Sequence, residues 1–161
     1  FDNCNFQNES YKGFKKVSST VGHNLMNNHP FSEQRYNQAN QNLKELITLL
    51  ETEDTEKFIS LTESEALTLH AMMMTSNPYF ILMKEGTISV IERVWEFRKE
   101  TNIPLSFTLD AGANVHLLYP KSYKQTVMDF IQSELIVFCE NQQYICDEVG
   151  SGAKILKESY A

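Results

Sequence analysis

One acidic residue, Asp110, stands between two apolar runs in the stretch LSFTLDAGANVHLLY, residues 105–119. The residues that follow it before the second run are Ala111, Gly112, Ala113 and Asn114. A hairpin turn explains Gly112 and Asn114, which tolerate unusual backbone angles, and aspartate is common at the first position of a turn. However, a tight hairpin needs only two such residues, and small residues let a backbone approach a ligand closely. The stretch is therefore typical either of a turn or of a carboxylate that faces a substrate.

Three hydroxyl side chains form a second candidate in the stretch KKVSSTVG, residues 15–22. Ser18, Ser19 and Thr20 stand where a strand would run into the first turn of a helix. The free N–H groups and the partial positive charge of a helix N-terminus can hold an anion there. The same residues also suit a plain N-cap, whose hydroxyl accepts a hydrogen bond from those N–H groups. The sequence alone leaves both interpretations open.

The histidines and cysteines do not have the spacing of metal ligands. His29 and His116 have no partner at such an interval, and His70 lies in a helical pattern beside apolar residues, where a packed, hydrogen-bonded histidine is the simpler interpretation. Three cysteines are too few and too scattered for a disulfide framework. Cys139 and Cys146 flank an expected turn, so we expect them to lie near each other. No metal site is predicted.

Composition and charge indicate a globular domain and argue against a polyanionic surface as its main partner. The chain has 161 residues, of which 42% are hydrophobic and 22% charged, as in a domain with its own core. Its formal net charge of -7 argues against nucleic acid or an anionic membrane surface as a partner. No apolar run approaches the roughly 20 residues of a membrane span, and we expect no signal segment. A reducing cytoplasm is the expected location.

Periodicity predicts a block of helices followed by hairpins and strands. Apolar residues recur at three- and four-residue steps over the ranges 32–52, 54–74, 86–101 and 122–135, which are the expected helices. The apolar residues of the first helix are Tyr36, Ala39, Leu43, Leu46, Ile47 and Leu50. The first two helices should form an antiparallel pair with Asp54 as the N-cap of the second. Strands are expected over 105–109, 115–119, 136–141 and 143–150, with short additional strands open within 1–13 and at 153–156. This order implies an α+β sandwich with helices on one side of an antiparallel sheet.

Three motifs in this order resemble the C-terminal half of diphosphomevalonate decarboxylases, which are members of the GHMP kinase superfamily. They are KKVSSTVGH from Lys15, the helical stretch ESEALTLHAMMMTSNPYF from Glu63 and FTLDAGANVHLLY from Phe107. The resemblance spans about Lys15 to Leu156. It implies an opening segment of residues 1–14 left from a preceding region. A GHMP kinase C-terminal domain would follow over 15–161, as a ferredoxin-like sandwich with four antiparallel strands packed against helices.

The resemblance also implies a reaction and a role for each matching residue. Family members use ATP and Mg²⁺ to phosphorylate the tertiary 3-hydroxyl of diphosphomevalonate, and then lose phosphate and carbon dioxide to leave isopentenyl diphosphate. Asp110 matches the catalytic aspartate near that hydroxyl, where a carboxylate can orient the attacking oxygen and accept its proton. The residues that the resemblance assigns to substrate binding are Ser18, Ser19, Thr20, Ala111 and Gly112.

Two family features are missing from the chain. The superfamily's Gly/Ser-rich phosphate loop and the arginine that contacts the substrate carboxylate belong to the N-terminal half, and no stretch here resembles them. We therefore expect a half-enzyme that is inactive alone. Its ATP and Mg²⁺ would be bound mainly by the N-terminal domain of the same enzyme, and the resemblance also leaves room for a homodimer. Two positions depart from the family pattern, because Ala113 replaces a proline and His23 replaces a methionine.

Two alternatives remain open. Sister enzymes with the same fold phosphorylate mevalonate or phosphomevalonate without decarboxylating the product. Alternatively, the chain acts alone as a binding or assembly module without catalysis. A Gly/Ser-rich phosphate loop encoded in frame upstream of Phe1 would exclude the module, whereas a start codon just upstream would exclude the enzyme.

Overall fold

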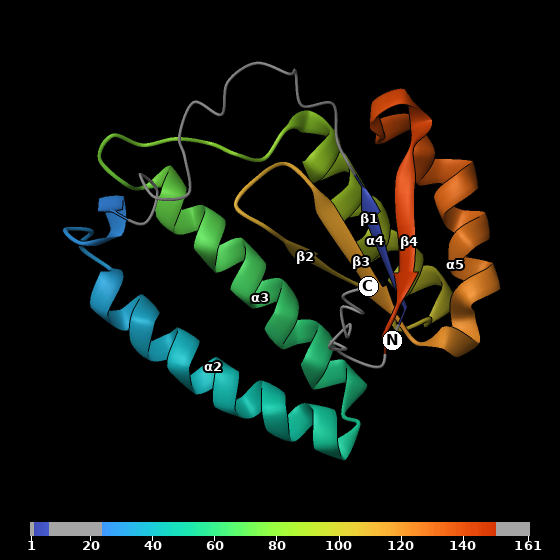
Figure 1. Cartoon of the computed structure of the whole chain (residues 1–161), viewed down its shortest axis with the longest axis horizontal. Coiled ribbons are helices and arrows are strands. Elements are labelled where there is room, and N and C mark those ends of the chain that lie inside the picture. Colours follow the sequence, from blue (N-terminus) through green and yellow to red (C-terminus); the bar gives the residue numbers. More distant parts are fainter. Residues whose placement is uncertain (1, 7–23, 151–161) are drawn as a thin grey trace, which may run out of the picture.

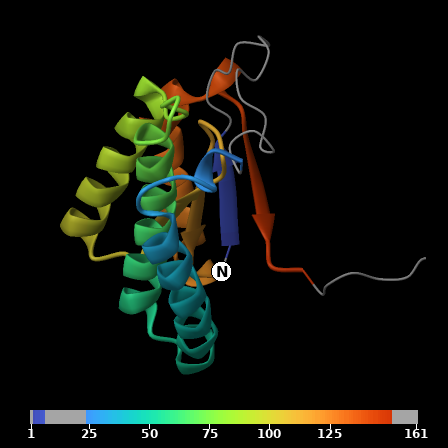
Figure 2. The same ribbon diagram turned by 90° about the vertical axis from the view of Figure 1, so that its left-hand side faces the viewer.

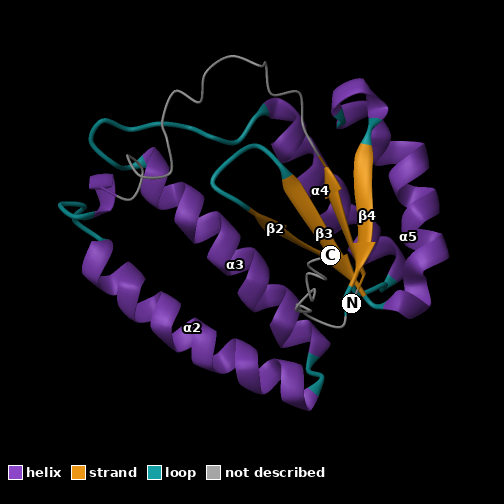
Figure 3. Ribbon diagram, viewed as in Figure 1, coloured by secondary structure: helices purple, strands orange, loops and turns teal. Residues whose placement is uncertain are grey.

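The computed structural model describes residues 2–6 and 24–150, which form a four-stranded antiparallel sheet with helices packed against it (Figure 1; Figure 3). The main elements in chain order are β1 (Asp2–Phe6), α2 (Ser32–Thr52), α3 (Thr55–Met74), α4 (Glu85–Thr101), β2 (Ser106–Leu109), β3 (Val115–Tyr119), α5 (Lys124–Phe130) and β4 (Tyr144–Glu148). The predicted substrate residues Ser18, Ser19 and Thr20, and the expected strand at 153–156, lie outside the described residues.

The strands have the spatial order β2-β3-β1-β4. All three pairings are antiparallel. With helices between β1 and β2 and between β3 and β4, this is the topology of a ferredoxin-like sandwich, and the predicted fold class is confirmed. The short strand expected within residues 1–13 is present as β1, which pairs with both β3 and β4. Residues 2–6 of the predicted opening segment therefore form an inner strand of the sheet.

Two helices, α4 and α5, lie behind the sheet and cover one of its faces (Figure 1; Figure 2). The alternation of β3 matches this arrangement, because Val115, Leu117 and Tyr119 are buried while the residues between them are only half-buried. The rings of Phe97 on α4 and Phe130 on α5 stack with centroids 4.1 Å apart. The core thus lies between these two helices and the sheet.

The first two long helices form the expected antiparallel pair beyond the edge strand β2 (Figure 1). Glu53 turns the chain with a left-handed backbone angle φ of 57°. Asp54 then caps α3 by accepting a hydrogen bond from the backbone N–H of Lys57 at 3.2 Å, as predicted. The predicted apolar face of α2 is mostly not buried. Leu49 is the single buried residue of this helix, and most of the predicted apolar positions are exposed.

The expected strand at 136–141 is wrong. After α5 the chain continues as a π-helical turn over Ile131–Leu135 and a 3₁₀ turn over Ile136–Phe138. Leu135 and Cys139 are both buried, and their four-residue spacing places them on the same side of these helical turns. An apolar run that continues a helix cannot be distinguished from a short strand by composition alone.

The expected proximity of Cys139 and Cys146 does not produce a bond between them. Cys139 is a free, buried thiol, whereas Cys146 is disulfide-bonded. Burial raises the pKa of the Cys139 thiol to about 11, so it stays protonated at neutral pH and is not a nucleophile. Within residues 2–6 and 24–150, no helix is long and apolar enough to cross a membrane.

Candidate active site

Asp110 stands where β2 ends, at the first position of the five-residue loop 110–114 that leads into β3. The last pair of the β2–β3 ladder joins Leu109 and Val115, both of which are buried. The Asp110 side chain leaves this buried layer and is exposed. In the described part of the chain no hydrogen bond or ion pair reaches its carboxylate. The predicted hairpin is confirmed.

A buried histidine on α3 holds the backbone of Asp110. The Nε2 atom of His70 donates a hydrogen bond to the carbonyl oxygen of Asp110 at 3.0 Å. His70 is 1% exposed, and this burial lowers the pKa of its imidazole despite the opposing effects of the Asp110 carbonyl and charge. The ring is therefore neutral at neutral pH, with its proton on Nε2. The prediction of a packed, hydrogen-bonded His70 is confirmed, and its partner is the loop that carries the aspartate.

A buried threonine at the start of α4 holds the other end of the loop. The Thr87 hydroxyl donates to the carbonyl oxygen of Ala113 at 2.8 Å and accepts from the backbone N–H of Lys84 at 3.0 Å. The second bond closes the first turn of α4, so the hydroxyl joins a helix N-terminus to the loop. Loop 110–114 is thus fixed at its first residue by α3 and at its fourth by α4. Sequence reasoning missed Thr87.

Gly112 leaves space for the Asp110 carboxylate. A Cβ atom built on Gly112 would lie 2.7 Å from Oδ1 of Asp110, closer than real Cβ contacts come. A larger residue here would therefore require the Asp110 carboxylate to move from its present position. Ala111 and Gly112 are half-buried beside the exposed aspartate, so the structure brings three of the predicted site residues together.

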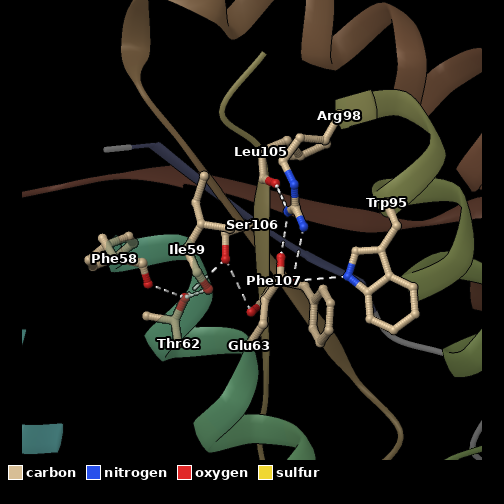
Figure 4. A network of polar contacts seen from close by, with 9 residues as sticks. All are labelled: Phe58, Ile59, Thr62, Glu63, Trp95, Arg98, Leu105, Ser106 and Phe107. Atoms are coloured by element: carbon tan, nitrogen blue, oxygen red, sulfur yellow. Dashed lines mark hydrogen bonds and ion pairs between the residues drawn. The ribbon is translucent and has the colours of Figure 1, made fainter. Parts of the chain in front are cut away.

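A buried ionic cluster holds together the elements that support the loop (Figure 4). Glu63 of α3 accepts from Trp95 Nε1 at 2.9 Å and from both terminal nitrogens of Arg98 at 2.6 and 3.1 Å. Arg98, also on α4, donates to the carbonyl oxygen of Leu105 at 2.6 Å, just before β2. Sequence reasoning missed this cluster. The seven-residue spacing of Glu63 and His70 indicates only that they share one face of α3, and it does not identify Trp95 or Arg98 as partners.

The described residues do not form a metal site. No group of three or more His, Cys, Asp or Glu side chains among residues 2–6 and 24–150 could hold a metal ion. A cavity of about 490 Å³ lies between α2 and α3, where its lining includes Arg35 and Met72, but no residue of loop 110–114 lines it. The chemical group that the geometry offers is thus one exposed carboxylate on a loop whose backbone is held at two points.

Comparison with known proteins identifies relatives of this arrangement. Residues 10–159 match the family described as mevalonate 5-diphosphate decarboxylase C-terminal domain. The phosphomevalonate decarboxylase of Haloferax volcanii is 28% identical over 108 residues, which are 67% of this chain and 32% of that protein.

Solved structures agree on the fold. The mevalonate pyrophosphate decarboxylase from Streptococcus pyogenes superposes with a TM-score of 0.83 at 24% identity, over 96% of this chain and 46% of that one. MDDEF in complex with MVAPP, AMPPCP and magnesium superposes with a TM-score of 0.76 at 22% identity, over 90% of this chain and 43% of that one. The chain therefore spans less than half the length of these relatives.

Proposed function

Because the chain belongs to the mevalonate 5-diphosphate decarboxylase C-terminal domain family, we propose that it forms the C-terminal half of an ATP-dependent decarboxylase. The substrate would be mevalonate 5-diphosphate, and the product isopentenyl diphosphate. The observation that carries the proposal is the placement of Asp110, an exposed carboxylate on a loop whose backbone is held by buried groups of two helices. A carboxylate on a loop held in this way is accessible to a ligand outside the chain.

The chemistry requires little more than positioning from this half. In the first step, the Asp110 carboxylate orients the 3-hydroxyl and accepts its proton while the oxygen attacks the terminal phosphorus of ATP and ADP leaves. In the second step, inorganic phosphate leaves C3, the bond to the carboxylate carbon breaks as carbon dioxide departs, and its electron pair forms the new double bond. Correct placement of the hydroxyl against the carboxylate is the main contribution of the protein.

The proposed cofactors, ATP and Mg²⁺, are assigned to no described residue. MDDEF was solved with AMPPCP, an ATP analogue, and magnesium, which supports ATP and Mg²⁺ for the proposed enzyme. Since the described residues contain no metal-binding cluster, no residue here is assigned to Mg²⁺. We place ATP and Mg²⁺ mainly on an N-terminal half of the kind that the longer relatives possess. The assignment of Ser18, Ser19 and Thr20 to the substrate's diphosphate remains part of the proposal, as does a cytoplasmic location, where ATP is supplied.

A second candidate substrate carries one phosphate fewer. The relative from Haloferax volcanii is a phosphomevalonate decarboxylase, so the number of phosphates on the substrate differs among similar proteins. Loop 110–114 faces the reacting hydroxyl in either case and does not discriminate between them. Comparing turnover on the two substrates decides the question. A stable phosphorylated product without release of carbon dioxide would mean that the enzyme is a kinase and not a decarboxylase.

The Asp110→Asn variant tests the proposal in the intact protein that contains these residues. Its turnover should fall by roughly 10²- to 10⁴-fold, because the amide cannot accept the hydroxyl proton, while KM changes little. The measurement follows ADP and carbon dioxide release together. The control is Asp129→Asn, which alters an exposed acid on α5 and should leave turnover unchanged. A near-normal rate in Asp110→Asn would return Asp110 to the role of a turn residue.

A further inference from the structure

A cavity of about 490 Å³ opens between α2 and α3, at the end of the pair where α2 begins and α3 ends (Figure 1). This volume is that of a small-molecule site, since ligand pockets measure roughly 300–1,000 Å³. Its apolar wall consists of Phe31, Ala71 and Met72, and its polar wall includes Gln34, Arg35 and Gln38. No residue of loop 110–114 lines it, so the cavity is not part of the site around Asp110.

A buried histidine, His29, holds the mouth of the cavity. It is 5% exposed, and its Nε2 donates a hydrogen bond to the Thr75 hydroxyl at 3.0 Å. That hydroxyl gives its own proton to the carbonyl oxygen of Ala71 at 2.8 Å. The Nδ1 of His29 accepts from the backbone N–H of Phe31 at 3.2 Å, and the two rings contact each other with centroids 5.7 Å apart. The Phe31 ring is nevertheless 58% exposed, so these bonds fix an aromatic ring at the cavity without burying it.

The polar wall carries a charge that the fold neutralises. Both terminal nitrogens of Arg35 donate to Glu65, at 3.2 and 2.5 Å. The Nε of Arg35 is buried and has no hydrogen-bond partner among the described residues. Such a donor is rare in folded proteins, and an acceptor atom on a ligand would complete it. An anion is disfavoured here, because it would lie close to the Glu65 carboxylate, so the wall suits a ligand without net charge.

Two glutamine amides lie beside this wall, one helical turn apart. Gln34 is exposed and Gln38 is half-buried, and no hydrogen bond within residues 2–6 and 24–150 reaches either side chain. Each amide presents a donor beside an acceptor, which is the pattern that pairs with the edge of a nucleobase. Aromatic rings such as that of Phe31 stack on the flat face of a base. The lining therefore offers stacking and paired hydrogen bonds.

We propose that this cavity binds a planar, uncharged nitrogen heterocycle, as a free nucleobase or a nucleoside. Phe31 stacks on the ring, the amides of Gln34 and Gln38 pair with its edge, and Arg35 donates to a ring acceptor. A nucleoside has about 20 non-hydrogen atoms, which at the efficiency of drug-sized ligands gives a Kd between about 10 and 500 μM. The site is independent of the proposed decarboxylation.

Isothermal titration calorimetry of the 161-residue chain with adenosine tests the proposal. The proposed ATP site belongs to an N-terminal half, so this chain keeps that site out of the measurement. Phe31→Ala should weaken adenosine binding about tenfold or more through lost stacking. Ala71→Trp, which fills the cavity from an exposed helix position, should abolish binding. The matched control is Tyr36→Ala, which removes a similarly exposed ring of α2 outside the lining and should leave the affinity unchanged.

The amides and the charge have their own tests. Gln34→Leu/Gln38→Leu keeps the approximate size of both side chains and should weaken adenosine binding about fivefold or more, because the paired hydrogen bonds are lost. ATP should bind no more tightly than adenosine, since Glu65 already neutralises Arg35. All substituted positions except Gln38 are exposed, so circular dichroism should show unchanged helix content.

Three outcomes would overturn the proposal. One is the absence of binding up to about 5 mM adenosine, well above the expected Kd. Another is an affinity that Phe31→Ala and Ala71→Trp leave unchanged, which would place the ligand elsewhere. The third is ATP binding about tenfold tighter than adenosine, which would identify an anion site. None of these measurements depends on catalysis, so the proposed function stands or falls separately.

Discussion

Two carboxylates within this domain have opposite surroundings. Glu63 is 7% exposed and receives hydrogen bonds from Trp95 and from both terminal nitrogens of Arg98 (Figure 4). Asp110 is exposed, and the described residues hold its loop through backbone carbonyls without using its carboxylate. The protein therefore satisfies the Glu63 carboxylate internally, whereas the Asp110 carboxylate has no partner among the described residues.

The difference supports the proposal that Glu63 has a structural role and Asp110 a functional one. A buried charge is costly unless it is paired and hydrogen-bonded, so Glu63 requires the donors that surround it. An exposed carboxylate has no such requirement. The two hydrogen bonds that hold the loop use the backbone carbonyls of Asp110 and Ala113, so the Asp110 carboxylate adds nothing to core packing. Stability should thus respond to changes at Glu63, and turnover to changes at the Asp110 loop.

The largest expected effect on stability is that of Glu63→Leu. Removing this carboxylate leaves the Arg98 guanidinium largely buried without its counter-ion, and breaking a buried pair in this way costs about 3–5 kcal/mol. Urea denaturation of the 161-residue chain measures the loss. The matched control is Glu56→Leu, an exposed position on the same helix, which should cost much less.

A double variant sharpens this result. Glu63→Leu/Arg98→Met removes both charges and should recover a good part of the loss, because apolar residues of similar size can replace a buried ion pair. If the double variant is no more stable than Glu63→Leu alone, the unpaired guanidinium is not the cause, and the contrast with Asp110 loses its basis.

A smaller loss is expected for Thr87→Val. Valine keeps the shape of threonine but removes the hydroxyl that bonds to Ala113 and Lys84, and buried partners that lose a bond cost about 1–3 kcal/mol. Thr87→Ser keeps the hydroxyl and should restore the turnover of the intact protein more fully than it restores the unfolding free energy. Equal turnover in the valine and serine variants would show that this support does not position the loop.

The sequence was informative where local pattern and local chemistry agree. The bounds of α2, α3 and α4 follow from apolar spacing and from signals such as Asp54, and the β2–β3 hairpin follows from alternation around Gly112. The spacing also predicts an apolar face on α2. Periodicity shows that a helix has such a face, but it does not show which element covers that face. The strand prediction for 136–141 is wrong because the chain continues as helical turns from α5 into this run.

The supports of the site depend on contacts between distant residues. Thr87 and Ala113 are 26 positions apart, and Glu63 and Arg98 are 35 apart. No local spacing specifies such pairs, because they exist only once α3, α4 and β2 have packed. Asp110 is a candidate from the sequence because its own neighbours are unusual, whereas the groups that hold its loop have ordinary neighbours.

A pH dependence should come from His70. Burial lowers the pKa of this imidazole in the folded state, so between that value and about 6.5 the unfolded chain binds more protons. The contribution of His70 to the free energy of unfolding should therefore be fully present above about pH 6.5. It should decrease as the pH falls, by about 1.4 kcal/mol in total for each unit by which the folded-state pKa is lowered. His70→Gln, measured by urea denaturation at a series of pH values, should show a flatter profile over this range. An unchanged profile would assign the dependence to other groups.

The smallest effect on stability is expected for Gly112→Ala, although its predicted steric contact is the closest at the site. The added Cβ would lie 2.7 Å from Oδ1 of Asp110, but that atom ends an exposed side chain that can rotate away. The backbone of Gly112 is not in the left-handed region, so alanine introduces no strain there. The free energy of unfolding should change by less than about 0.5 kcal/mol, as for ordinary surface substitutions.

Turnover of the intact protein should nevertheless fall by about 10- to 100-fold, because a displacement of the reacting group by about 1 Å is enough for such a loss. A variant that loses stability and turnover together would mean that the loop is part of the packed structure, and Asp110 and Glu63 would then no longer represent different kinds of site.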